Sequence, residues 1–174
     1  MKHTLLTLTL ILTLNTQAQD FASKFMTLCT PDDSITCQTV GPKMMQRLVE
    51  SLRTTPNDTT LTPTDSCTTT DDEAAAEIFA KLKSARIVTT HTNAQTLYQR
   101  AQTLMEENKN RFTLLTTAQP DTQTQVYTRQ HNNIIRELVM LNLSPQGLLT
   151  IVCLTGQMDK EFMQALATSN QIQK

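Results

Sequence analysis

The sequence predicts an α+β domain in which helices are packed on one face of a mostly antiparallel sheet, with a C-terminal β-meander. Two observations favour this fold class. Apolar residues recur at helical spacing mainly in the first half of the chain, whereas the second half carries four successive strand-like segments. The separators at 119–122, 131–133 and 144–147 are short and rich in turn-forming residues, so adjacent strands should pair as hairpins.

Residues 1–18 are typical of a cleaved secretory signal peptide. Lys2 supplies a basic start, and an apolar run interrupted only by Thr extends from Leu5 to Leu14, before a small residue at Ala18. The run is shorter than the about 20 residues that a transmembrane helix needs, and no Cys follows it as in a lipoprotein. We therefore expect 19–174 to be a single periplasmic domain, with the outer surface or the extracellular medium as the alternative.

The first half of the mature chain is expected to alternate helices with short strands. The predicted elements are, in order, a helix with Phe21, Phe25 and Leu28 on its apolar side, a half-buried strand from Ile35 to Val40, a helix opened by Gly41-Pro42, an exposed Thr-rich loop at about 54–70, a helix ending near Leu82, a strand from Ala85 to Thr90, and a helix from Ala94 to about Asn108 capped by Asn93. The helix after Pro42 carries an apolar stripe, which consists of Met44, Met45, Leu48, Val49 and Leu52.

The second half is expected to form the meander. Its strands are predicted at Arg111 to Thr117, Thr124 to Gln130, Ile134 to Leu143 and Leu148 to Thr155. The last two are the most apolar, so we place them at the centre of the sheet. Gly156 and Asp159 are interpreted as a turn into a last helix, from Lys160 to about Ala167.

Bulk composition argues against several function classes. The net charge of −1, the pI near 6.3 and the absence of a basic run do not fit a nucleic-acid partner. Only three glycines are present, so no Gly-rich phosphate loop exists. We expect no cofactor and no metal, and a binding or interaction role is favoured over an enzyme.

Two alternatives remain open. An enzyme of unrecognised type would use His91 or His131 with a carboxylate, although neither histidine lies in a metal-binding or catalytic motif. A carrier of a small apolar ligand would hold it between sheet and helices, in a cavity lined by residues such as Met140, Ile151 and Phe162.

Four cysteines lie in the predicted mature chain, where an oxidising compartment permits disulfides in three fully paired connectivities. Cys29 and Cys37 flank a turn-like segment and are the first candidates for a disulfide. Cys153 lies in an apolar run and is interpreted as a small buried side chain. The sequence does not fix the partner of Cys67.

The order of several segments carries a family resemblance. They are Ser84-Ala85-Arg86-Ile87-Val88, the helix with Tyr98, Gln125-Val126-Tyr127, Ile135-Arg136-Glu137-Leu138-Val139, and Leu149 to Thr155 followed by Gly156-Gln157-Met158-Asp159. With this order the chain resembles the domain of unknown function 4252 family, small exported proteins found mainly in Bacteroidetes.

The resemblance implies no activity and no catalytic residues. Export, a single compact domain and the lack of a reactive motif lead us to expect an exported envelope protein with an unknown envelope partner or small ligand. The resemblance adds a place near genes for extracytoplasmic sigma factors, which fits envelope stress signalling. Asp33-Ser34-Ile35 and Asp58-Thr59-Thr60 resemble O-glycosylation acceptors of Bacteroidetes, so Ser34 and Thr59 are candidate modification sites.

Overall fold

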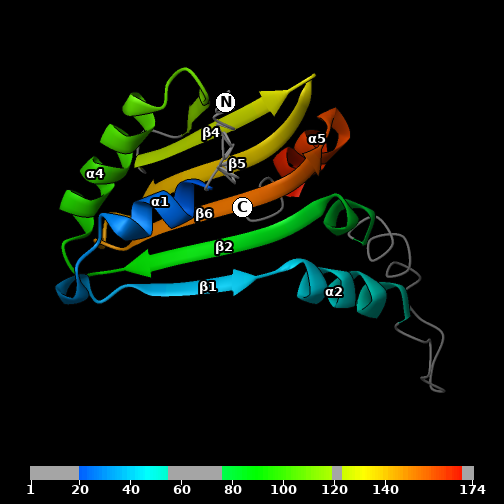
Figure 1. Cartoon of the computed structure of the whole chain (residues 1–174), viewed down its shortest axis with the longest axis horizontal. Helices are drawn as coiled ribbons and strands as arrows, with labels where there is room; N and C mark the ends of the chain where they lie inside the picture. The colour runs from blue at the N-terminus through cyan, green and yellow to red at the C-terminus, as the bar shows by residue number, and fades with distance from the viewer. Residues whose placement is uncertain (1–19, 55–75, 119–122, 170–174) are drawn as a thin grey trace, which may run out of the picture.

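The computed structural model describes residues 20–54, 76–118 and 123–169, and its centre is a six-stranded antiparallel sheet (Figure 1). The strand order is β1 (Thr36–Val40), β2 (Leu82–Thr90), β6 (Leu149–Met158), β5 (Ile134–Leu143), β4 (Gln123–His131) and β3 (Thr113–Ala118). The predicted α+β class and the meander of β3 to β6 are confirmed. The central position predicted for the two most apolar strands, β5 and β6, is also confirmed.

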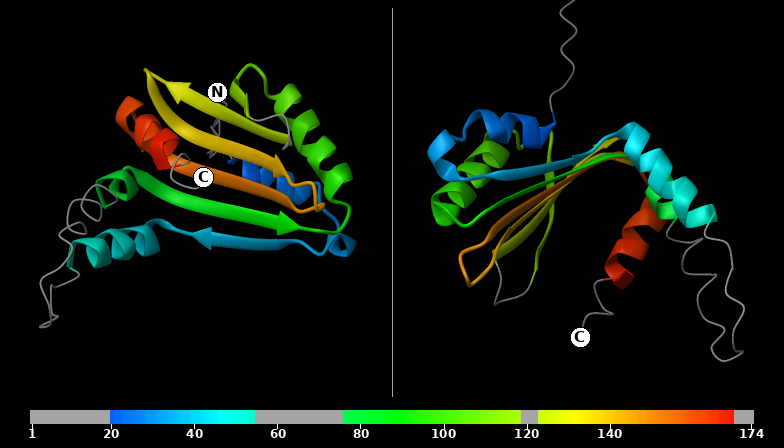
Figure 2. Two further views of the ribbon diagram at one scale, coloured as in Figure 1. Left: turned by 180° about the vertical axis from the view of Figure 1, so that it is seen from behind. Right: turned by 90° about the horizontal axis from the view of Figure 1, so that it is seen from below.

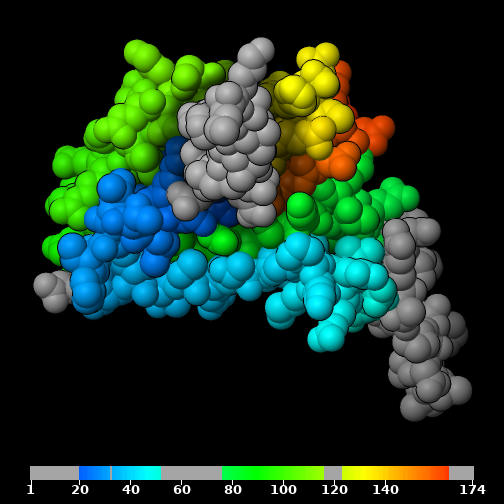
Figure 3. All heavy atoms as spheres, viewed as in Figure 1, coloured from blue at the N-terminus to red at the C-terminus, as the bar shows by residue number. Residues whose placement is uncertain are grey.

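Helices pack against the sheet from both sides, whereas the sequence predicted them on one face. They are α1 (Phe21–Thr27), α2 (Pro42–Thr54), α4 (Ala94–Glu107) and α5 (Lys160–Ser169), with a short 3-10 turn at Pro31–Asp33 and helical residues at 76–80. Helices α1 and α4 lie side by side (Figure 3) and cover one half of one face of the sheet (Figure 1). Helices α2 and α5 lie at the opposite end and extend behind the sheet (Figure 2). We call the face under α1 and α4 the front face.

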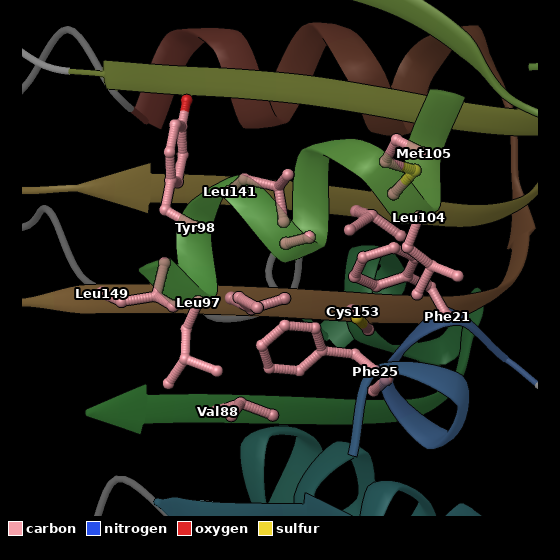
Figure 4. Close-up of a cluster of buried hydrophobic side chains, with 14 of the residues drawn as sticks. Phe21, Phe25, Val88, Leu97, Tyr98, Leu104, Met105, Leu141, Leu149 and Cys153 are labelled. Atoms are coloured by element: carbon pink, nitrogen blue, oxygen red, sulfur yellow. The ribbon is translucent and has the colours of Figure 1, made fainter. Parts of the chain in front are cut away.

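The first core lies between the front face and helices α1 and α4. Successive side chains of a strand point to opposite faces, so Val139 and Leu141 of β5 and Ile151 of β6 all point toward these helices. Phe25 of α1 and Leu97 of α4 belong to the same cluster and are fully buried (Figure 4). The predicted apolar sides of the first helix and of the helix after Asn93 therefore form this core.

A second, smaller core lies behind the sheet. Leu138 of β5 points away from the first core and packs with Met45 of α2 and Phe162 of α5. A bulge in the pairing of β5 with β6, between Ile135 and Glu137, brings Ile135 to the same side. Both central strands are thus covered on two faces at this end, which explains why their sequences are nearly continuous in apolar residues.

Several predicted apolar positions are more exposed than expected. Among the stripe residues whose side chains the structure describes, Met45 and Val49 are buried, while Met44 and Leu48 remain exposed, because α2 touches the end of the sheet with one narrow side. Leu28 is exposed as well. Strand β1 was expected to be half-buried, but it is the edge strand and four of its five residues are exposed.

Two predicted boundaries are wrong for local reasons. Leu82, expected on a helix, is the first residue of β2, and Gly156, expected in a turn, lies within β6. A β-carbon at Gly156 would lie 2.2 Å from the carbonyl oxygen of Lys81, so the strand passes this backbone too closely for any side chain. Gly156 is therefore a position of close approach.

Asn93 begins α4 without capping it through its side chain. Its backbone has a left-handed φ of 53°, and its side-chain amide donates to Asp33 Oδ1 at 3.1 Å instead. Asn93 thus ties the start of α4 to the turn after α1. The predicted Thr-rich loop at 54–70 lies almost wholly outside the described residues and stays a prediction.

Candidate functional site

A groove with a volume of about 1300 Å³ opens on the half of the front face that α1 and α4 leave uncovered. Strands β2, β4, β5 and β6 supply its floor, while the start of α1, the start of α2 and residues 79–83 supply its walls. The lining includes five cationic side chains, namely Lys81, Lys83, Arg86, Arg129 and Arg136, and one carboxylate, Asp20. We refer to this feature as the groove.

One polar row crosses the four strands at the floor of the groove. Ser84 pairs with Thr155, Thr155 with Glu137, and Glu137 with Arg129 in the strand register. Residues directly opposite in a ladder share a face, so these four side chains stand together on the front face. The hydroxyl oxygens of Ser84 and Thr155 are 2.6 Å apart, within hydrogen-bond distance.

Glu137 is the most buried charged residue of the described chain, with an exposed fraction of 0 %. Its carboxylate accepts a hydrogen bond from the backbone N–H of Phe21 at 2.6 Å and another from Arg129 Nε at 2.9 Å. A buried carboxylate without such donors would be strongly destabilising. Glu137 therefore links the floor of the groove to the first residue of α1.

A second ionic contact holds the same end of α1. Asp20 is the N-cap residue, since its Oδ1 accepts from the backbone N–H of Ser23 at 2.8 Å. Arg86 of β2 donates through Nη1 to Asp20 Oδ1 at 3.1 Å and also to the Ser23 hydroxyl. Asp20 thus links Arg86 to the start of α1, just as Glu137 links Arg129 to the first residue of α1.

Lys81, in the wall of the groove, forms ion pairs with two carboxylates. Its ammonium group lies 2.7 Å from Asp159 and 3.2 Å from Glu161. The hydrogen bond with Asp159 raises the pKa of Lys81, and the same bond lowers the pKa of Asp159. Asp159 also accepts from the backbone N–H of Phe162, so it caps the first turn of α5.

The remaining two cations differ from Lys81. Lys83, which is exposed, and Arg136, which is half-buried, have no ion-pair partner within the described part of the chain. Arg129 uses Nε alone and Arg86 uses Nη1 alone among the contacts of the described residues. Several guanidinium N–H groups are therefore available in the lining of one groove, which suits a carboxylate or phosphate group.

The two histidines considered for catalysis are not brought together. His91 follows the end of β2, on the side of the sheet where β4 begins, whereas His131 ends β4. At about 3.3 Å per residue, β4 alone separates these two ends by about 26 Å. Both histidines are exposed, and neither lines the groove.

The predicted apolar cavity is not formed by the three residues named for it. Ile151 belongs to the first core and Phe162 to the second, on opposite sides of the sheet. Met140 precedes Leu141 on β5 and points away from the first core. None of the three lines the groove.

The cysteines of the described residues are free thiols in the structure. Cys29 donates to the carbonyl oxygen of Phe25 at 3.3 Å, and Cys37 is exposed on the edge strand β1. Cys153 is buried in the first core, where burial raises the pKa of its thiol well above the ordinary value. A disulfide between Cys29 and Cys37 stays a prediction.

The candidate glycosylation residues are not brought to the groove. Ser34 is exposed and has a left-handed φ of 46° at the end of the 3-10 turn. Thr59 lies outside the described residues. Modification of either residue stays a prediction.

Sequence reasoning missed the groove because its cations are scattered from position 81 to position 136. A signal was nonetheless present. Arg86, Arg129 and Glu137 stand at inward-facing positions of strands whose neighbouring inward positions are apolar, such as Val88 and Val139. Charged residues at such positions indicate a buried ionic cluster or a site.

Within the described part of the chain, no helix is both long and apolar enough to cross a membrane. The same residues contain no group of three or more His, Cys, Asp or Glu side chains arranged to hold a metal ion.

Comparison with known proteins gives one match. No curated protein and no solved structure matches the chain. A family model described as Domain of unknown function (DUF4252) matches residues 31–166, which include β1 to β6 and every described strand residue of the groove floor. The chain therefore belongs to the DUF4252 family.

Proposed function

We propose that this protein is an exported, non-enzymatic binding protein of the cell envelope, and that the groove is its binding site for an anionic ligand. One observation carries the proposal: five cationic side chains line the groove, and two of them, Lys83 and Arg136, have no ion-pair partner within the described part of the chain. The leader-like residues 1–18 support the expected compartment. A role in envelope stress signalling would follow if the ligand were an envelope component released by damage.

Binding is favoured over catalysis by the state of the acidic groups. Glu137 is fully buried and already accepts two hydrogen bonds, and Asp20 is engaged by Ser23 and Arg86. A general acid or base must reach the proton that it transfers, and Glu137 is buried away from solvent, while Oδ1 of Asp20 is already shared by Ser23 and Arg86. The cationic groups, in contrast, retain unused donors that point to recognition of negative charge.

Charge substitution in the groove tests the proposal. Inorganic phosphate and acetate would be titrated into the purified protein while the unfolding temperature is measured. Phosphate also stabilises proteins through exclusion from their surfaces, so only a difference between variants is informative. We expect the double variant Lys83→Gln/Arg136→Gln to lose most of the anion-dependent rise.

The matched control is Lys43→Gln/Arg47→Gln, which removes two exposed cations of α2 that do not line the groove. This control should respond like the unchanged protein. Equal responses in both double variants, or no response in the unchanged protein, would refute an anion site in the groove.

A further inference from the structure

We infer that the ligand is an anionic amphiphile, with a carboxylate or phosphate head at the arginines of the groove and an alkyl chain along its apolar wall. The inference rests on the proposed function and adds the chemical class of the ligand. It depends on three observations: the available donors, the apolar wall opposite them, and the size of the groove.

The head would bind where three strands present arginine side chains. Arg86, Arg129 and Arg136 come from β2, β4 and β5, so their backbones are held by the sheet. Glu137 and Asp20 fix the guanidinium groups of Arg129 and Arg86 at one edge each. A planar guanidinium held in this way keeps its other N–H groups oriented for an oxyanion, which lowers the ordering cost of binding.

The apolar wall lies on Pro42–Val49 of α2 and on the segment around the start of β2. Pro42, Met45, Val49, Phe79 and Leu82 line this part of the groove. Phe79 is 39 % exposed and lines the groove. Met45, Val49 and Leu82 are already buried, so the exposed apolar surface of this wall belongs to Pro42 and Phe79. A small inorganic anion would leave that surface in water, whereas an alkyl chain would remove apolar surface on both partners from water.

The volume favours a ligand larger than a head group alone. At about 1300 Å³, the groove exceeds the roughly 300–1,000 Å³ typical of pockets for drug-sized ligands. A bound phosphate or acetate would fill only a small part of it. An extended chain attached to the same head would occupy the remainder and reach the Phe79 side.

A homologous series of ligands tests the inference by calorimetry below the micelle concentrations. One arm uses methyl, butyl, hexyl and octyl phosphates, and the other uses the carboxylates with the same alkyl chains. We expect Kd to fall about two- to fourfold for each added methylene, since burial of one methylene contributes up to about 0.8 kcal/mol. The stronger arm identifies the head group, and octyl glucoside supplies a neutral amphiphile.

Two variants test the apolar wall and the cationic part of the groove separately. Phe79→Ser should flatten the dependence on chain length and leave methyl phosphate binding unchanged, while Lys83→Gln/Arg136→Gln should weaken every chain length by a similar factor. Leu114→Ser is the matched control for Phe79, because Leu114 is 45 % exposed on β3 and lies outside the groove. Phe79→Leu keeps the wall apolar and should retain the length dependence, which separates lost burial from altered folding.

The outcomes separate the two proposals. Binding of short anions with no dependence on chain length would overturn the amphiphile and leave the anion-binding function intact. Failure of every anion to bind would overturn both. Equal affinity for octyl glucoside and octyl phosphate would overturn the anionic head.

Discussion

The two ends of the front face are built from the same strands but hold different chemistry. On β5, Leu141 and Glu137 point to the same side, and both have an exposed fraction of 0 %. Leu141 meets apolar side chains under α4, whereas Glu137 meets Arg129 and the backbone of Phe21. Equal burial therefore does not mean equal contribution to stability.

The difference shows how the fold separates stability from binding. The apolar end gains free energy from the area that α1 and α4 remove from water. The ionic end gains less, because desolvation of buried charges offsets much of their attraction. The ionic end instead fixes the positions of side chains, since Glu137 and Asp20 hold two arginines and the start of α1 at the groove.

The largest effect is expected at the apolar end. Leu141→Ala should lower the free energy of unfolding by about 3 kcal/mol, because it removes buried methyl groups and leaves a cavity in the first core. Urea unfolding measures this loss. Anion affinity at the groove should stay unchanged, and a loss below about 1 kcal/mol would show that the apolar end is not the main source of stability.

A smaller loss is expected at the ionic end. Glu137→Leu leaves Arg129 and the Phe21 N–H without their acceptor, which should cost about 2 kcal/mol, reduced because Arg129 is 27 % exposed and can turn to water. Urea unfolding again gives the value.

Glu137→Gln is the control for that substitution, since its amide oxygen can still accept one of the two bonds. It should cost less than Glu137→Leu. If Glu137→Leu lowered the free energy of unfolding as much as Leu141→Ala or more, the apolar end would not be the greater source of stability.

Much of the fold could be predicted because it depends on periodic burial. The central strands β5 and β6 and the core side of α4 are specified by apolar alternation and helical spacing. The family assignment followed from the order of the same elements and is confirmed over residues 31–166. The exposure of Met44 and Leu48 could not be predicted, since it depends on how narrowly α2 contacts the end of the sheet.

The groove could not be predicted for a different reason. Its cations come from separate strands and are brought into one groove only by the register of the sheet. A shift of one residue in that register would turn the side chains of a strand to the opposite face. The bulges at the pairs Leu82/Ser84 and Ile135/Glu137 change which side chains face the groove. No local sequence pattern predicts these bulges. Gly156 was noticed in the sequence, but its role became visible only beside Lys81.

The smallest loss of stability is expected at Gly156, which lies at the ionic end of the front face. Gly156→Ala would place a methyl group 2.2 Å from the Lys81 carbonyl oxygen, a backbone atom that also accepts from the Gln157 N–H at 2.9 Å. The contact can be relieved only if the segment before β2 moves away, so we expect a loss of about 1.5 kcal/mol in urea unfolding.

Gly41→Ala is the matched control, because Gly41 also lines the groove but a β-carbon there would meet no atom within 4 Å. It should be nearly neutral. Movement of Lys81 and Leu82 in Gly156→Ala would also shift the apolar wall relative to the arginines, so octyl phosphate affinity should fall more than methyl phosphate affinity. Equal stability losses in the two glycine variants would mean that the close approach of β6 to Lys81 is not the cause of the loss in Gly156→Ala.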